Sequence, residues 1–333
     1  MSRTLTRVLA AVLLLAATGC GQRPAQTNGS SSLTIAVIPK GTSHIFWQSI
    51  HAGANRAAKE LGGVEIIWRG PLREDDRDSQ VSEVEGFVTR GVSGIVLAPL
   101  DEAALVGPVA DATRRKIPVV IFDSGLKSDD YVSFVATDNL KGGQLGGQRL
   151  AETMKGKGKG KVVLLRYAEG HDSTAKREDG FLEAMKAHPE IEVVSSNQYV
   201  GADVEGAYKR AEAILSTYKK PDGSLGIDGI FCPNESSTFA TLRVLQDNGW
   251  AGKVRFVGFD SSENMVKGLH DRALDGLVVQ DPVHMGYLAV TTMVAHLKGQ
   301  PVQKWIDTGV HVATKDNMNS PEMKALLEPD LPK

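Results

Sequence analysis

Cysteine is almost absent from this chain of 333 residues, which contains only Cys20 and Cys232. Two thiols cannot supply the several disulfides that hold small secreted domains together, so a disulfide scaffold is excluded. Cys232 closes a short apolar run, and we interpret it as a small buried side chain. The chain must therefore fold around apolar cores, and its length favours more than one.

The chain also lacks an excess of positive charge, since 38 Lys and Arg residues stand against 40 Asp and Glu residues. This balance argues against a nucleic-acid partner. Lys and Gly alternate at 155–161, and we interpret this segment as an exposed connection, not as a basic binding patch.

Motifs of enzymes and metal sites are missing as well. The chain contains no H-E-x-x-H, Walker or G-x-S-x-G pattern, so we expect neither catalysis nor a cofactor. The charged run at 73–78 has mixed signs and lacks the spacing of a calcium loop. We interpret it as the solvated entry to a helix and expect no metal there.

An apolar run from Val8 to Ala17 follows Arg3 and Arg7 at the N-terminus. It is too short to span a bilayer, which takes about 20 residues, and is typical of an export signal. The segment 17–20 (ATGC) resembles the lipobox of bacterial lipoproteins, which implies removal of residues 1–19 and acylation of Cys20. The alternative is an ordinary secretory signal with a chance cysteine. The polar segment 20–32 is predicted to be a flexible tether.

Short β-branched runs alternate with longer helix-period segments through the rest of the chain. This alternation predicts an α/β protein with doubly wound, Rossmann-like parallel sheets. The expected strands are 33–38, 64–68, 94–98, 119–122, 161–166, 191–199, 229–232, 254–259 and 277–280. The expected helices are 46–61, 79–90, 102–115, 139–154, 173–187, 204–218, 236–248 and 283–298.

In such sheets ligands bind at the carboxyl ends of the strands. That rule selects 39–47, 123–124, 167–177, 233–236, 260–261 and 280–284 as the segments that carry the site. Forked donors, carboxylates, amides and two aromatic rings occur there, a set that suits a polyhydroxylated ring. The candidate residues are Lys40, His44, Phe46, Trp47, Asp123, Ser124, Arg177, Asn234, Asp260 and Gln280.

A series of motifs in fixed order then resembles one family, the type I periplasmic binding proteins of sugar ABC transporters, near the ribose-binding branch. The motifs are 35–40 (IAVIPK), 44–47 (HIFW), 90–96 (RGVSGIV), 117–123 (IPVVIFD), 137–139 (TDN), 177–181 (REDGF), 233–235 (PNE), 257–260 (VGFD) and 279–280 (VQ). The resemblance implies two lobes joined by a three-stranded hinge, 33–137 plus 281–310 and 138–280 plus 311–333, with crossings near 137–139, 280–282 and 310–313.

The resemblance also implies roles for the candidate residues. Phe46 and Trp47 correspond to an aromatic clamp on the sugar ring, and Asp123 and Asp260 to acceptors of hydroxyl hydrogen bonds. Arg177, Asn234 and Gln280 correspond to the donors that complete the network. For Asp123, Arg177, Asn234 and Asp260 the alternative is an ion pair between lobes or a helix cap.

Two positions depart from the ribose pattern, and they leave the ligand open. Lys40 replaces a small hydroxyl residue and Ser124 replaces an arginine, features that resemble the autoinducer-2 and rhamnose receptors. One hypothesis is that Lys40 favours an anionic ligand, and the alternative is a snorkelling surface lysine. His44 is a further candidate donor.

The predicted function is an extracytoplasmic binding lipoprotein, a monomer that captures a sugar-like ligand and delivers it to an ABC permease. One alternative is a signal receptor for a furanosyl, autoinducer-2-like or anionic sugar ligand, acting through a chemoreceptor or a sensor. A sugar-responsive repressor would need a DNA-reading helix-turn-helix before the sensor body. A hydrolase would need a nucleophile and a base at strand ends.

Overall fold

The computed structural model describes residues 32–156, 158–329 and 331. The predicted signal peptide at 1–19, the lipidation site Cys20 and all of the tether except Ser32 lie outside the described residues. Within the described ranges, no helix has both the length and the apolar character needed to cross a membrane.

The first sheet has six strands, all parallel, in the order β2-β1-β3-β4-β5-β11. Its two central strands, β3 and β4, are apolar and buried along their whole length, which is typical of a parallel sheet covered on both faces. The strands are β1 (Leu33–Ile38), β2 (Val64–Trp68), β3 (Gly94–Leu97), β4 (Val119–Phe122), β5 (Ser133–Ala136) and β11 (Trp305–Asp307).

The second sheet repeats this order as β7-β6-β8-β9-β10-β12. Its last strand differs from that of the first sheet, because β12 pairs with β10 in the antiparallel sense. The strands are β6 (Gly160–Arg166), β7 (Ile191–Tyr199), β8 (Gly229–Phe231), β9 (Arg255–Phe259), β10 (Gly276–Val279) and β12 (His311–Ala313).

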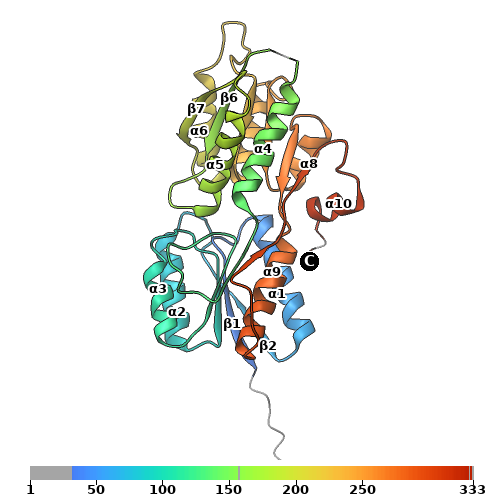
Figure 1. Ribbon diagram of the computed structural model, residues 1–333. Helices are drawn as coiled ribbons and strands as arrows, with labels where there is room; N and C mark the ends of the chain where they lie inside the picture. The colour runs from blue at the N-terminus through green and yellow to red at the C-terminus, as the bar shows by residue number, and fades with distance from the viewer. Residues whose placement is uncertain (1–31, 157, 330, 332–333) are drawn as a thin grey trace, which may run out of the picture. The chain divides into compact units, whose positions relative to one another are not determined.

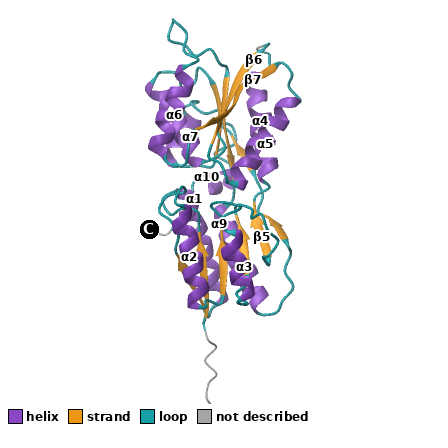
Figure 2. Cartoon of the chain, turned by 90° about the vertical axis from the view of Figure 1, so that its left-hand side faces the viewer, coloured by secondary structure: helices purple, strands orange, loops and turns teal. Residues whose placement is uncertain are grey.

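Helices cover both faces of each sheet, and both sheets belong to one compact unit, Ser32–Lys333. In the first sheet α1 and α9 lie on one side and α2 and α3 on the other (Figure 1). In the second sheet α4 and α5 face α6 and α7 across the strands (Figure 2). The helices are α1 (Ile45–Leu61), α2 (Arg77–Arg90), α3 (Val106–Arg114), α4 (Asn139–Met154), α5 (Asp172–Lys186), α6 (Val204–Ser216), α7 (Glu235–Asp247), α8 (Glu263–His270), α9 (Pro282–Leu297) and α10 (Pro321–Leu327).

The chain passes between the sheets three times. It leaves β5 of the first sheet to form α4 on the second, and it leaves β10 of the second sheet to form α9 on the first. The third passage runs from β11 to β12, through residues 308–310. Each sheet is therefore covered in part by a helix that follows a strand of the other sheet.

Glycines bring two pairs of helices into close contact. A Cβ added at Gly53 of α1 would lie 1.9 Å from the carbonyl oxygen of Val283, at the start of α9. In the second sheet a Cβ at Gly143 of α4 would lie 1.9 Å from the carbonyl oxygen of Arg177 on α5. Backbones at this separation admit no side chain, so glycine sets the spacing of both helix pairs.

The predicted α/β class with two doubly wound sheets is confirmed. Strands are found at all nine predicted places and helices at all eight, with small differences at their ends. The prediction was incomplete for β5, β11, β12, α8 and α10, which are all short. Cys232 is fully buried, as predicted, and burial raises the pKa of its thiol to about 12.

Candidate functional site

Asp123 and Asp260 occupy equivalent places in the two sheets. Asp123 follows β4 and Asp260 follows β9, and each of these strands is the fourth in the order of its sheet. Both residues have a left-handed backbone, with φ of 61° at Asp123 and 66° at Asp260. Their amides donate to Val135 and Val278 of the neighbouring strands, at 3.1 and 2.7 Å. Such conformations cost about 1–3 kcal/mol in a residue other than glycine, and they concentrate at functional sites.

A small cavity of about 30 Å³, which we call the central cavity, lies where the carboxyl ends of the two sheets meet. Nine of the ten predicted site residues line it, and the exception is Ser124. Five further residues line it that were not among the candidates: Glu74, Tyr167, Ser173, Thr174 and Glu235.

The positive charge of Lys40 is already compensated by the carboxylate of Asp123. Nζ of Lys40 lies 2.9 Å from Oδ2 of Asp123, and it donates to Oγ of Ser173 at 2.9 Å. The side chains of Lys40 and Asp123 are each 4% exposed. Ser124 helps to hold Ser173 in place, since its Oγ accepts the amide hydrogen of Ser173 at 3.1 Å.

Glu74 is a buried carboxylate with three donors. Nε1 of Trp47 and the hydroxyl of Tyr167 each donate to it at 2.6 Å, and Nδ1 of His44 lies 2.9 Å away. Burial opposes ionisation, but His44 and Lys40 outweigh it and lower the pKa of Glu74. Burial likewise opposes a charge on His44, yet Glu74 raises the His44 pKa to about 9. At neutral pH the two form an ion pair.

Asp260 is held by residues from several elements. Nε2 of Gln280 donates to its Oδ1 at 2.7 Å, and Nη1 of Arg177 lies 3.8 Å from its Oδ2. Burial raises the pKa of Asp260, while the Arg177 charge works against that rise. Oε1 of Gln280 is buried and has no hydrogen-bond partner within the described residues. It is therefore an acceptor that a ligand hydroxyl can satisfy.

Arg177 is fixed in place by the protein. Its Nε donates to Oδ1 of Asn139 at 2.8 Å and its Nη1 to the carbonyl of Pro233 at 3.0 Å. The guanidinium lies over the ring of Phe259, 3.8 Å from its centroid. The fork is thus oriented before any ligand arrives.

Asn234 and Glu235 begin α7. Oδ1 of Asn234 accepts the amide hydrogen of Ser237 at 3.2 Å, so this side chain caps the helix. Glu235 accepts only a long bond, 3.4 Å, from the amide of Phe46. Burial raises the pKa of Glu235 to about 7, with His44 opposing the rise.

Phe46 and Trp47 lie at the start of α1 and pack against each other edge to face, with ring centroids 4.9 Å apart. Trp47 also meets Phe122 at 6.2 Å. Both rings reach the cavity from the first sheet. Aromatic faces are a suitable wall for the apolar faces of a sugar ring.

Glu74 is the residue that sequence reasoning placed wrongly, in a solvated charged run. The run does open a helix, because Asp76 caps α2 by accepting the amide hydrogen of Ser79 at 3.1 Å. Glu74 nevertheless turns inward and is only 9% exposed. The other four additions fall inside the strand-end segments that the sequence selected.

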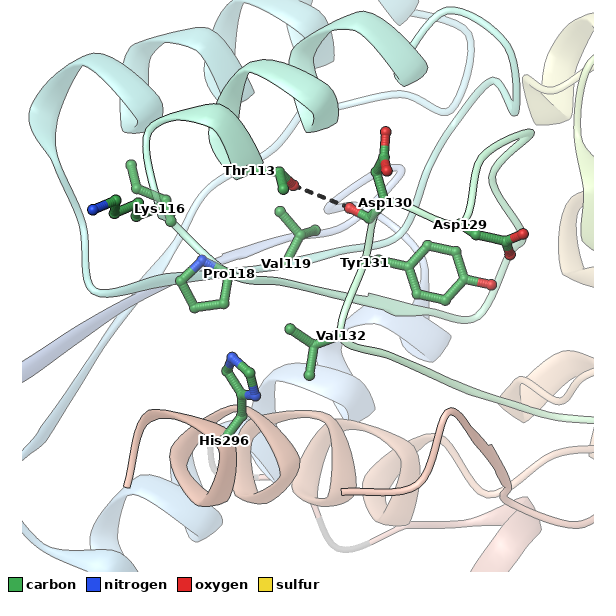
Figure 3. Close-up of a pocket in the computed structure, with 10 residues that line it drawn as sticks. Thr113, Lys116, Pro118, Val119, Asp129, Asp130, Tyr131, Val132 and His296 are labelled. Atoms are coloured by element: carbon green, nitrogen blue, oxygen red, sulfur yellow. Dashed lines mark hydrogen bonds between the residues drawn. The ribbon is translucent and has the colours of Figure 1, made fainter. Parts of the chain in front are cut away.

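Another pocket, of about 400 Å³, lies at the amino ends of the strands of the first sheet, opposite to the central cavity. Figure 3 shows the residues that line it. His296 at the end of α9 lies on one side of it, and Thr113 and Asp130 on the other, joined by a 3.1 Å hydrogen bond. Val119, the first residue of β4, also lines it. Ligands of doubly wound sheets bind at the carboxyl edge, so this pocket is not the candidate site.

The described residues contain no group of three or more His, Cys, Asp or Glu side chains placed to hold a metal ion. The central cavity instead offers carboxylates, amides, one fixed guanidinium and the aromatic rings of Phe46, Trp47 and Tyr167. This set can bind a small polar molecule through directed hydrogen bonds.

Comparison with known proteins gives a consistent result. The family described as periplasmic binding protein domain matches residues 35–301. The ribose import binding protein of Haemophilus influenzae is 26% identical over 94% of this chain and 100% of its own length. The D-allose-binding periplasmic protein of Escherichia coli is 28% identical over 80% of this chain and 86% of its own length.

Two solved structures are also similar to this chain. A solute binding protein of Agrobacterium radiobacter in complex with D-arabinose is 32% identical, with a TM-score of 0.84, covering 90% of this chain and 100% of that one. A solute binding protein of Agrobacterium vitis with bound D-fucose is 34% identical, with a TM-score of 0.82, covering 88% and 99%.

Proposed function

The chain belongs to the periplasmic binding protein domain family, and on that premise we propose that it captures a small uncharged polyol, a sugar or sugar-like molecule, for an ABC permease. It is an extracytoplasmic substrate-binding protein and not an enzyme. The observation that supports the ligand class is the central cavity, where polar side chains from the carboxyl ends of both sheets converge.

The charges of the cavity favour an uncharged ligand. Lys40 is paired with Asp123 and His44 with Glu74, while Arg177 lies near Asp260. Each cation therefore has a carboxylate partner, and Glu235 adds a further acidic group. A sugar acid or a sugar phosphate would bring a charge for which the described residues that line the cavity offer no free cation.

Ligand entry requires the two sheets to move apart. The cavity of about 30 Å³ is far below the roughly 300 Å³ at which small-molecule pockets begin. Side chains fill the space by bonding across it, as Tyr167 does to Glu74 and Lys40 does to Ser173. We propose that residues 33–137 plus 281–310 and residues 138–280 plus 311–333 separate as two lobes and close again around the ligand.

The N-terminal segment completes the proposal. An export signal at 1–19 and acylation of Cys20 would attach a monomeric receptor to the membrane through the tether at 20–32. The motif 17–20 supports this anchor. Acyl chains give about 0.8 kcal/mol per buried methylene, so two or more chains hold a protein at a bilayer.

The test is a thermal-shift screen of the purified protein, confirmed by calorimetry. The panel contains D-ribose, D-allose, D-arabinose, D-fucose and xylitol, with D-gluconate and D-ribose 5-phosphate as anionic counterparts. We expect at least one uncharged compound to stabilise the protein, and Asp260→Ala to lose at least tenfold in affinity for it. Asp316→Ala, an exposed position, serves as the control. Stabilisation by the anionic compounds alone, or by none, would contradict the proposal.

A further inference from the structure

A larger space, which we call the outer chamber, lies next to the central cavity. Its volume is about 530 Å³, and it shares His44, Glu74 and Glu235 with the central cavity. These three side chains therefore form the boundary between the two spaces. A ligand ring in the central cavity would have one of its positions facing the outer chamber.

Most of the charged side chains around the outer chamber already have a partner. Asp203 accepts the amide hydrogen of Gly206 at 2.6 Å, and Glu205 pairs with Lys209 at 2.7 Å. Nε of Arg73 donates to Asp75 at 2.9 Å. Glu235 accepts only the long bond from Phe46, so the wall has more carboxylates than cations and disfavours an anionic ligand group.

Neutral groups supply the rest of the wall. Phe239 lies one helical turn after Glu235 on α7, and its half-buried ring lines the outer chamber. Ser262 begins α8, but its side chain does not cap that helix, so its hydroxyl stays available. Asn264 adds an exposed amide. An aromatic face beside a hydroxyl and an amide is the same kind of surface that binds a sugar ring.

We propose that the outer chamber is a second subsite, which takes an uncharged substituent on the bound sugar. The ligand class is then a glycoside or a disaccharide, with one ring in the central cavity and its substituent against Phe239. This inference rests on the proposed function, because it assumes a sugar ring in the central cavity. The outer chamber, at about 530 Å³, has room for such a substituent, whereas the central cavity, at about 30 Å³, accepts the sugar ring only after the two sheets move apart.

The experiment compares free sugars with their glycosides by calorimetry. The probes are D-ribose, D-allose, D-arabinose and D-fucose, each with its methyl and phenyl glycosides in both anomeric forms. For at least one sugar we expect one phenyl glycoside to bind about tenfold more tightly than the free sugar, with the methyl glycoside between them. The gain reflects burial of an aromatic group against Phe239.

Two variants test whether the gain in affinity comes from the outer chamber. Phe239→Ala is expected to remove most of the tenfold preference while leaving free-sugar affinity within about twofold. Asn264→Trp should fill the outer chamber and reject the phenyl glycoside without weakening the free sugar. Tyr218→Ala is the matched control, because Tyr218 packs against the same core as Phe239 but does not line the chamber.

The outcomes separate the two proposals. If free sugars bind and every glycoside is rejected, or if Phe239→Ala leaves the preference unchanged, the second subsite is wrong and the proposed function stands. If neither sugars nor glycosides bind, the proposed function itself fails. If a glycoside binds more tightly than its free sugar and Phe239→Ala removes that difference, both proposals are supported.

Discussion

The Lys40–Asp123 ion pair is the most enclosed one at the site, with both side chains 4% exposed. Removing one member of a buried pair leaves the other charge without compensation. We expect Lys40→Met to lower the free energy of unfolding by about 3 kcal/mol, measured by urea denaturation. The double variant Lys40→Met/Asp123→Asn should recover much of this loss, since asparagine tolerates the left-handed backbone at position 123.

An exposed pair provides the control for this comparison. Lys209 and Glu205 lie one helical turn apart with 71% and 81% of their side chains exposed. Lys209→Met should therefore change the stability by less than about 0.5 kcal/mol. Equal effects of the two lysine substitutions would show that the Lys40 pair is not enclosed in solution.

His44 makes stability depend on pH. Its pKa is about 9 in the folded protein against 6.5 when unperturbed. A raised pKa means that the folded state binds the proton more tightly, so its contribution is complete below about pH 6.5 and is lost as the pH rises to 9. We expect the unfolding free energy to fall by up to about 1.4 kcal/mol per pH unit in that window.

His44→Asn isolates this contribution. Glu235, whose pKa is about 7, also binds protons more tightly in the folded state and adds to the decline at lower pH. The comparison is therefore made between pH 7.5 and 9, by urea denaturation of both proteins at each pH. A variant that declines as steeply as the wild type would contradict the assignment of this slope to His44.

Most candidate site residues that follow a strand could be predicted from sequence, although Tyr167, which follows β6, was not among the candidates. The rule that ligands bind at carboxyl ends of strands located Lys40, Asp123, Asp260 and Gln280 without any knowledge of contacts. Glu74 could not be found in this way, because it precedes a helix within a run of charges. Whether such a carboxylate faces water or three buried donors depends on tertiary contacts, which a charge pattern does not contain.

At the scale of elements, the contact between α4 and α5 controls the position of Arg177. The Cα of Gly143 lies so near α5 that an added Cβ would be 1.9 Å from the Arg177 carbonyl oxygen. Gly143→Ala must push the helices apart, and we expect a loss of about 2–4 kcal/mol in stability together with weaker ligand binding. Differential scanning calorimetry and ligand titration measure the two effects.

Gly86 is the matched control, since it lies within α2 and an added Cβ would meet nothing within 4 Å. Alanine favours a helix over glycine by about 0.5–1 kcal/mol, so Gly86→Ala should stabilise the protein slightly. Opposite signs at the two positions are expected from close packing. A stabilising Gly143→Ala would refute the argument.

The elements that sequence reasoning found and missed differ in length and exposure. Strands such as β3, β4 and β10 are wholly apolar and buried on both faces, a pattern that is visible in sequence. The strand β11 has three residues, and its Trp305 and Asp307 are exposed. Only pairing with β5 makes this segment a strand, so no local pattern marks it.

At the scale of the whole molecule, the two sheets repeat one strand order and place one aspartate at the same point of each. The chain joins them through three short segments and no long linker. Hydrogen bonds also join the two halves, including one from the amide of Glu102 to the carbonyl of Gly170 at 3.1 Å. Two similar halves with few connections can rotate about the connections while each core stays intact.

We therefore expect an equilibrium between open and closed forms that both the ligand and the protein's own bonds influence. Tyr167→Phe removes the hydroxyl that joins the second sheet to Glu74, whereas His44 and Trp47 still compensate that carboxylate. Without ligand, the variant should populate the open form more than the wild type, because one bond specific to the closed form is lost. Small-angle scattering should show a larger radius of gyration for the free variant.

Saturating ligand should make the two proteins equally compact, since ligand contacts with both lobes supply the missing free energy. The affinity of Tyr167→Phe should fall by about three- to tenfold, as expected for the loss of one hydrogen bond to a charged group. Tyr218→Phe is the control, because the Tyr218 ring packs on the core of the second sheet away from the site. Identical scattering with and without ligand for all three proteins would exclude the hinge motion and leave a rigid receptor.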